Sequence, residues 1–192
     1  MSKGMSKHLS LLLAGSLTLM LAACSERKGC SIKGHTSFEQ YQKAYLTDLD
    51  QRPVDSVEIA EGKFAFDRKE SAAEPYAMLV RLQQTAEPHD WIEMPVFIEN
   101  GDVRMEIGEY IHTAGTPLNE ALQSFFDQLQ QSKDAIAAKE GVPVEEIENT
   151  FSEFYRQQIM LNQGNALGRY IYRAYGIHLK GEDKAQVEEI MK

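Results

Sequence analysis

The sequence holds few of the residues from which common catalytic centres are built. It has two cysteines and five histidines, and it contains no Cys-x-x-Cys, Gly-x-Ser-x-Gly, His-Glu-x-x-His or phosphate-binding glycine loop. The histidines are scattered, and no two of them have the spacing of metal ligands. We therefore assign no catalytic or metal-binding residue and expect no cofactor.

Positive charge is also scarce. Lys and Arg number 20 against 29 Asp and Glu, a net charge of −9. Residues 1–23 contain two of the lysines and no acid, so the remainder has 18 basic and 29 acidic residues and a charge of −11. Such a balance argues against nucleic acid and anionic lipid surfaces as electrostatic partners.

A single long apolar run is present, near the N-terminus. Residues 9–23 carry no charge and follow two lysines, Lys3 and Lys7. This layout is typical of a secretory signal peptide over residues 1–23, and the run is short for a membrane-spanning helix.

The end of this run resembles the lipobox of bacterial lipoproteins. The segment Leu21-Ala22-Ala23-Cys24 has the spacing of that motif, in which the cysteine is lipidated and becomes the first residue of the mature protein. The resemblance implies acyl chains such as palmitate on Cys24 and a lasting membrane anchor. An ordinary signal peptide that happens to precede a cysteine is the alternative.

The residues after Cys24 predict a location. Residues 24–29 are polar and are expected to form a lipidated tether. Ser25 stands where an aspartate would resemble an inner-membrane retention signal. We therefore expect a cell-envelope protein in the outer membrane, facing the periplasm.

With Cys24 lipidated, Cys30 is the remaining cysteine. In an oxidising compartment a single cysteine is buried, paired with another chain, or reactive. Cys30 opens a segment that predicts a first strand, so a buried free thiol is favoured.

Residues 30–115 show short strand-like patterns and predict an antiparallel β domain. Residues 54–60 and 63–67 flank Glu61-Gly62, and residues 91–99 and 102–108 flank Asn100-Gly101. Both turns predict hairpins. We expect an antiparallel β-sandwich or partial barrel.

Residues 116–192 predict helices, which makes the fold class α+β. Thr116-Pro117 is typical of a helix start, and Leu118, Leu122, Phe125 and Leu129 then form one apolar stripe. Further helices are expected from about residue 143, over 166–175 and over 182–191.

Many aromatic residues lie at helical spacings, which favours a place in the core. The alternative is a groove for a partner helix or an apolar ligand. Trp91 alone is weak support for a sugar-binding surface. The helical aromatic residues are Phe125, Phe126, Phe151, Phe154, Tyr155, Tyr170, Tyr172 and Tyr175.

Four segments, in order, resemble one family: residues 55–57, 61–66, 96–101 and 115–120. They are similar to the N-terminal domain of unknown function in envelope lipoproteins of Gram-negative gut anaerobes. In that family a thioredoxin-like AhpC/TSA thiol–disulfide oxidoreductase domain usually follows. The resemblance implies a β domain followed by a helical linker.

The Cys-x-x-Cys of that oxidoreductase domain does not occur in this sequence. We therefore expect a non-enzymatic envelope lipoprotein that binds or positions a partner protein, for example a redox protein. One alternative is an enzyme, with this chain as the truncated or split N-terminal part of the oxidoreductase. A second is a glycan-binding lipoprotein, which requires exposed aromatic residues in a concave site.

Overall fold

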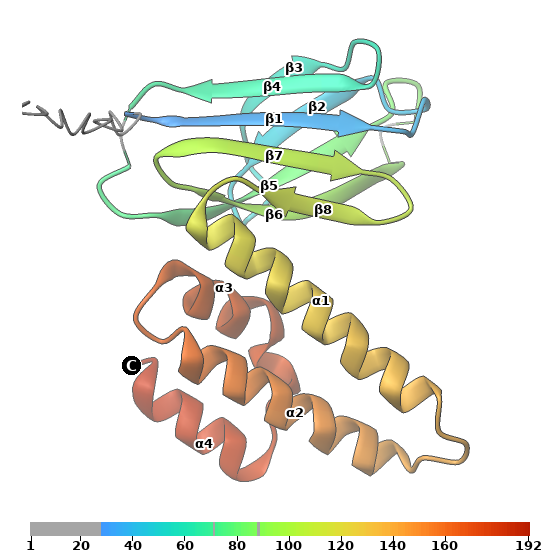
Figure 1. Cartoon of the computed structure of the whole chain (residues 1–192), viewed down its shortest axis with the longest axis vertical. Coiled ribbons are helices and arrows are strands. Elements are labelled where there is room, and N and C mark those ends of the chain that lie inside the picture. Colours follow the sequence, from blue (N-terminus) through green and yellow to red (C-terminus); the bar gives the residue numbers. More distant parts are fainter. Residues whose placement is uncertain (1–27, 71, 88) are drawn as a thin grey trace, which may run out of the picture.

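The computed structural model describes residues 28–70, 72–87 and 89–192. Two layers of four strands stack face to face, and four α-helices lie together beside them (Figure 1). The predicted α+β class and β-sandwich are confirmed. The proposed signal peptide, the lipobox residues Leu21, Ala22 and Ala23, and the lipidation site Cys24 lie outside the described residues.

The first sheet has the order β4-β1-β7-β8. β1 runs antiparallel to β4 but parallel to β7, so the expectation of a wholly antiparallel domain is wrong for this pair. Between β1 and β7 the chain forms β4 and all four strands of the second sheet. It then returns to the first sheet in its original direction, so β7 runs parallel to β1. The strands are β1 (Cys30–Thr36), β4 (Lys63–Arg68), β7 (Gly101–Ile107) and β8 (Ile111–Ala114).

The second sheet has the order β3-β2-β5-β6 and is antiparallel throughout. Its edge strand β6 contains Pro95, which cannot donate a backbone hydrogen bond and is tolerated at an edge. The strands are β2 (Lys43–Thr47), β3 (Pro53–Glu58), β5 (Tyr76–Gln83) and β6 (Trp91–Ile98).

Both predicted hairpins are wrong, because each turn carries the chain from one sheet to the other. Glu61-Gly62 joins β3 to β4, which lie in different sheets, and the isolated bridge between Ala60 and Lys63 at this turn lies beyond the end of β3. Asn100-Gly101 likewise joins β6 to β7. A tight turn reverses the chain in either case, and two strands from opposite sheets face a shared core as well as two strands of one hairpin do.

The helices follow the predicted pattern closely. Leu122, Phe125 and Leu129 are buried as the stripe predicts, and the Asn165 side chain accepts hydrogen bonds from the first turn of the third helix. None of the helices in the described ranges is both long and apolar enough to cross a membrane. They are α1 (Pro117–Ala137), α2 (Val144–Leu161), α3 (Ala166–Tyr175), a short 3-10 turn (Gly176–His178) and α4 (Gly181–Ile190).

The described residues form two hydrophobic cores, one between the sheets and one among the helices. Phe97 of β6 belongs to the helical core, whereas its neighbours Val96 and Ile98 belong to the sandwich core. Successive strand residues point to opposite faces, so Phe97 projects from the outer face of the second sheet into the helices. Its ring meets Tyr170 of α3 edge-on, with centroids 6.1 Å apart.

Candidate functional site

The structure buries the thiol of Cys30, as its place in a predicted strand favoured. Cys30 is 2% exposed at the start of β1 and forms no disulfide within the described residues. Burial raises the pKa of its thiol, which disfavours the reactive thiolate. His35 lies towards the other end of β1, with its Nδ1 atom 3.0 Å from the Glu106 carboxylate.

Metal-ligating side chains are also dispersed. Within the ranges that the structure describes, no group of three or more His, Cys, Asp or Glu residues is placed to hold a metal ion. The polar groups that do converge lie where the sandwich meets α1.

Asn119 lies at the centre of this contact between the sandwich and α1, which we call the joint. Its side chain is fully buried, and Oδ1 accepts from the Phe97 amide at 2.9 Å while Nδ2 donates to the Phe97 carbonyl at 2.9 Å. Nδ2 also donates to Thr116 Oγ1 at 2.8 Å. The carboxamide thus pairs with the edge of β6 as a neighbouring strand would.

Glu99 completes the joint by capping α1. Its Oε1 atom accepts from the amides of Leu118 at 2.8 Å and Asn119 at 3.3 Å. Thr116 occupies the predicted N-cap position, but its side chain makes no capping hydrogen bond. A carboxylate at the first turn satisfies free amides and complements the helix dipole.

Gln123 covers the edge of the other sheet. It follows Asn119 by one helical turn, and its Oε1 atom accepts from the Thr113 amide of β8 at 2.8 Å. Its Nε2 atom donates to Asp127 at 2.8 Å. Two amide side chains of α1 therefore cap the neighbouring edges of both sheets.

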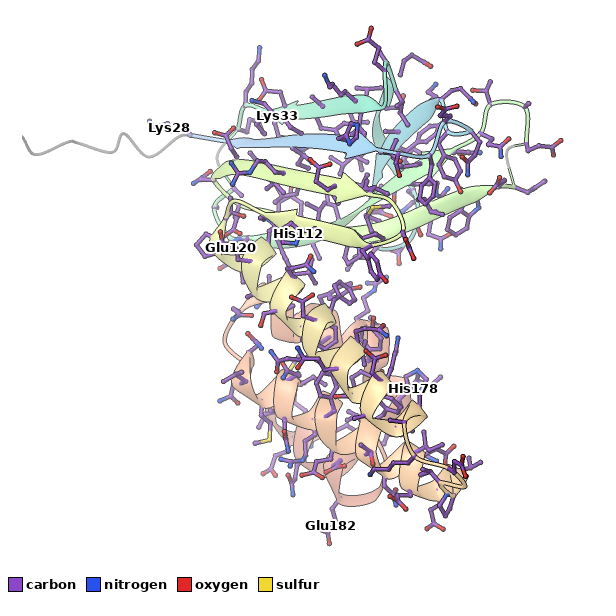
Figure 2. All side chains as sticks on the ribbon, turned by 45° about the vertical axis from the view of Figure 1, so that its right-hand side comes forward. Lys28, Lys33, His112, Glu120, His178 and Glu182 are labelled. Carbon is purple, nitrogen blue, oxygen red and sulfur yellow. The ribbon has the colours of Figure 1, made fainter. Side chains whose placement is uncertain are left out.

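Beyond these two caps α1 runs away from the sandwich, as Figure 1 shows. A groove of about 700 Å³, which we call the edge groove, lies between the sandwich and the helices. His112 of β8, one of its lining residues, lies where the sandwich meets the helices (Figure 2). Tyr110 is 80% exposed and Ile111 43% exposed at this place. The apolar and aromatic lining of this edge groove comprises Met94, Pro95, Tyr110, Ile111, Phe126, Leu129, Tyr170 and Tyr175.

The charged residues that line the edge groove include Glu93, which forms an ion pair, and further acidic and basic side chains. Glu93 is largely buried against Arg81, whose Nη2 atom lies 2.7 Å from it. Glu109 and Asp127 are further carboxylates, and Lys133 is the basic residue of the lining. The guanidinium of Arg81 also lies 4.6 Å from the ring centre of Trp91, so the residue considered for sugar stacking has a face already covered.

Buried Tyr155 and partly buried Tyr170 and Tyr175 connect the groove to the helical core. Burial raises the pKa of Tyr155 to about 12 and also raises the pKa of Tyr170 and Tyr175. The Tyr155 and Tyr175 rings stack with centroids 4.8 Å apart.

These shifts predict alkaline destabilisation. A folded-state pKa above the ordinary value near 10 means that the unfolded chain loses its phenolic protons first. The contribution of these tyrosines to the free energy of unfolding is therefore expected to stay constant below pH 10 and to fall as the pH rises through 12. Urea titrations across this range measure the fall, and Tyr155→Phe should reduce it. Tyr110→Phe, at an exposed position, should leave it unchanged; an equal reduction by both variants would contradict the assignment.

The joint explains where two of the family-like segments lie. Residues 96–101 supply Phe97 and Glu99, and residues 115–120 supply Thr116 and Asn119, so segments separated along the chain meet in one set of hydrogen bonds. Residues 30–122 match the family described as Domain of unknown function (DUF4369). No curated protein matches the chain. The matched residues thus include the sandwich, Asn119 with its partners Phe97, Glu99 and Thr116, and the first residues of α1.

The match agrees with the family predicted from the four segments as far as a domain of unknown function. Its association with thioredoxin-like domains stays a prediction. Sequence reasoning missed Asn119, Gln123 and Glu99 as joint residues. A signal existed for Asn119, which lies three residues before Leu122 and so on the buried side of α1, where a polar group requires a partner.

Proposed function

We propose that this chain is a membrane-anchored envelope lipoprotein whose DUF4369 domain and helices form a non-catalytic module that binds and positions a partner protein. The observation that carries the proposal is the edge groove, in which exposed Tyr110 and Ile111 adjoin an aromatic lining from α1 and α3. Concave sites of mixed aromatic and polar lining are the usual places of recognition.

The position at which β1 begins supports this function. β1 begins at Cys30, directly after the proposed anchor segment, and runs parallel to β7. The turn that carries Tyr110 follows the far end of β7, about 20 Å along the strands from Cys30. The start of β1, which follows the proposed anchor segment, therefore lies at the other end of the strands from this part of the groove.

The partner that the family resemblance favours is a redox protein of the envelope. A glycan is the second candidate ligand, because Tyr110 offers an exposed ring next to the Glu109 carboxylate. Outer-membrane anchorage through an acylated Cys24 is part of the same proposal.

Site-specific photo-crosslinking tests the proposed function. A photoreactive residue at Gln130, an exposed position in the groove lining, is expected to yield a discrete protein adduct in intact envelopes. The same residue at Val144, which is 70% exposed and outside the groove, is the matched control. Absence of an adduct at Gln130, or an identical adduct at Val144, would overturn the proposal.

Anchorage is tested separately on the native protein. Mass spectrometry of the membrane-extracted protein should find an N-terminal peptide that begins at Cys24 and has the added mass of acyl chains, and Cys24→Ser should release the protein from the membrane fraction. A mass without lipid would contradict the anchor but leave the groove proposal standing.

A further inference from the structure

The edge groove is lined by edge-strand residues that lie beyond those capped by α1. On β8 the Thr113 amide is capped by Gln123. Backbone groups two residues apart in a strand point the same way, so the Ile111 N–H and C=O face the same edge. Ile111 lines the groove and lies two residues along β8 from the capped Thr113.

The edge of β6 is arranged in the same manner. Asn119 caps Phe97, whereas Glu93 and Pro95 direct their outer backbone groups to the same edge and line the groove. Because Pro95 lacks an N–H, the uncapped residues of β6 are poorly suited to regular pairing with an added strand, although they form a longer stretch than those of β8. The better receptor for an added strand is therefore β8 at Ile111.

The charge of the groove selects the occupant. Glu93 is neutralised by Arg81, which leaves Glu109 and Asp127 against Lys133. The chain as a whole has 29 acidic and 20 basic residues, so no wider positive field opposes a cation. The exposed ring of Tyr110 adds a favourable surface for an ammonium or guanidinium group.

We propose that the edge groove binds an extended, lysine- or arginine-bearing segment of the partner protein, an inference that rests on the proposed function. The segment pairs its backbone with Ile111 at the edge of β8. Its basic side chains lie against Tyr110, between Glu109 and Asp127, and its apolar side chains face Ile111 and Phe126. This is strand addition with charge selection.

Labelled peptides test the chemistry of the occupant. The full-length protein in detergent is titrated into three fluorescein-labelled peptides of about ten residues, in which valine alternates with lysine, glutamate or serine. Fluorescence anisotropy should show binding of the lysine peptide, with an affinity that falls as salt is raised. Equal binding of all three peptides, or binding of none, would overturn the inference.

Two groove variants and one matched control locate the binding. Glu109→Gln and Tyr110→Ala are each expected to weaken the lysine peptide, roughly tenfold together. Glu140→Gln removes the same charge from an exposed position outside the groove and should have no effect. Equal weakening by all variants would show a general charge effect and contradict the proposed site.

The two proposals fail in distinguishable ways. An adduct at Gln130 without binding of the lysine peptide would refute the basic segment and retain a partner at the groove. Binding of labelled oligosaccharide that Tyr110→Ala abolishes, without a protein adduct, would replace both proposals by the glycan function.

Discussion

Replacing Phe97 by alanine is expected to lower the free energy of unfolding by about 3–5 kcal/mol, the range for truncation of a fully buried phenylalanine. Phe97 is 0% exposed and is the β6 residue that enters the helical core, where its ring meets Tyr170. The truncation leaves a cavity between the second sheet and α3, because the backbone of β6 is held by Asn119 and β5 and cannot close it. Urea unfolding followed by circular dichroism measures the loss.

A matched variant separates the cavity from the loss of apolar contact. Phe97→Leu keeps an apolar side chain at the joint and should cost clearly less than Phe97→Ala. Val96→Ala, a truncation of the neighbouring residue in the sandwich core, should leave the packing of the helices intact. If Phe97→Ala proved no worse than an exposed substitution such as Val54→Ala, the ring would not be the link between the two cores.

Replacing Asn119 by aspartate is expected to destabilise the protein strongly although the two side chains have the same shape. The amide donates from Nδ2 to the Phe97 carbonyl and to Thr116, and an ionised carboxylate offers these groups only acceptors. The new charge would also be fully buried and close to Glu99, which bonds the same residue's backbone amide. A loss of at least about 3 kcal/mol follows, because a buried group left without its partner costs about 1–3 kcal/mol and the charge adds to it.

The pH dependence of this variant identifies the cause. Burial beside Glu99 raises the pKa of an aspartate at this position, so the folded state binds its proton more tightly than the unfolded chain does. The destabilisation should therefore be smaller at acidic pH and grow as the pH rises. Asn119→Ala lacks a titrating group and should show a loss without this added pH dependence. A pH-independent loss for Asn119→Asp would mean that the carboxylate had escaped to solvent.

Local patterns predicted the helices well because their causes lie within a few residues. The apolar stripe of α1 and the Asn165 cap of α3 are set by spacing and by hydrogen bonds between near neighbours. The same holds for the buried Cys30, whose strand was visible in the sequence. The strand partners were harder, since Asn100-Gly101 permits a hairpin and a crossing between sheets equally well.

The sequence allowed a groove of aromatic residues as an alternative, but it did not predict which residues line it. Aromatic residues at helical spacing allowed a groove as an alternative to core, and the structure contains both: Phe125 is in the core, whereas Phe126 and Tyr175 line the edge groove. Which aromatic residue belongs to which place depends on the direction in which α1 leaves the sandwich. That direction is set by the hydrogen bonds of Asn119 and Gln123 to strands β6 and β8.

The sequence by itself determined the acidic charge, the lack of the catalytic motifs sought, the position of each helix and the β character of residues 30–115. These depend on composition and on periodicity, which act along the chain. Only the tertiary structure decided the sheet to which each strand belongs, the parallel pairing of β1 with β7, and the groove between the two sheet edges. They arise from contacts between residues far apart in the chain, such as Phe97 with Asn119, whose free energy is realised only when both elements are already in place.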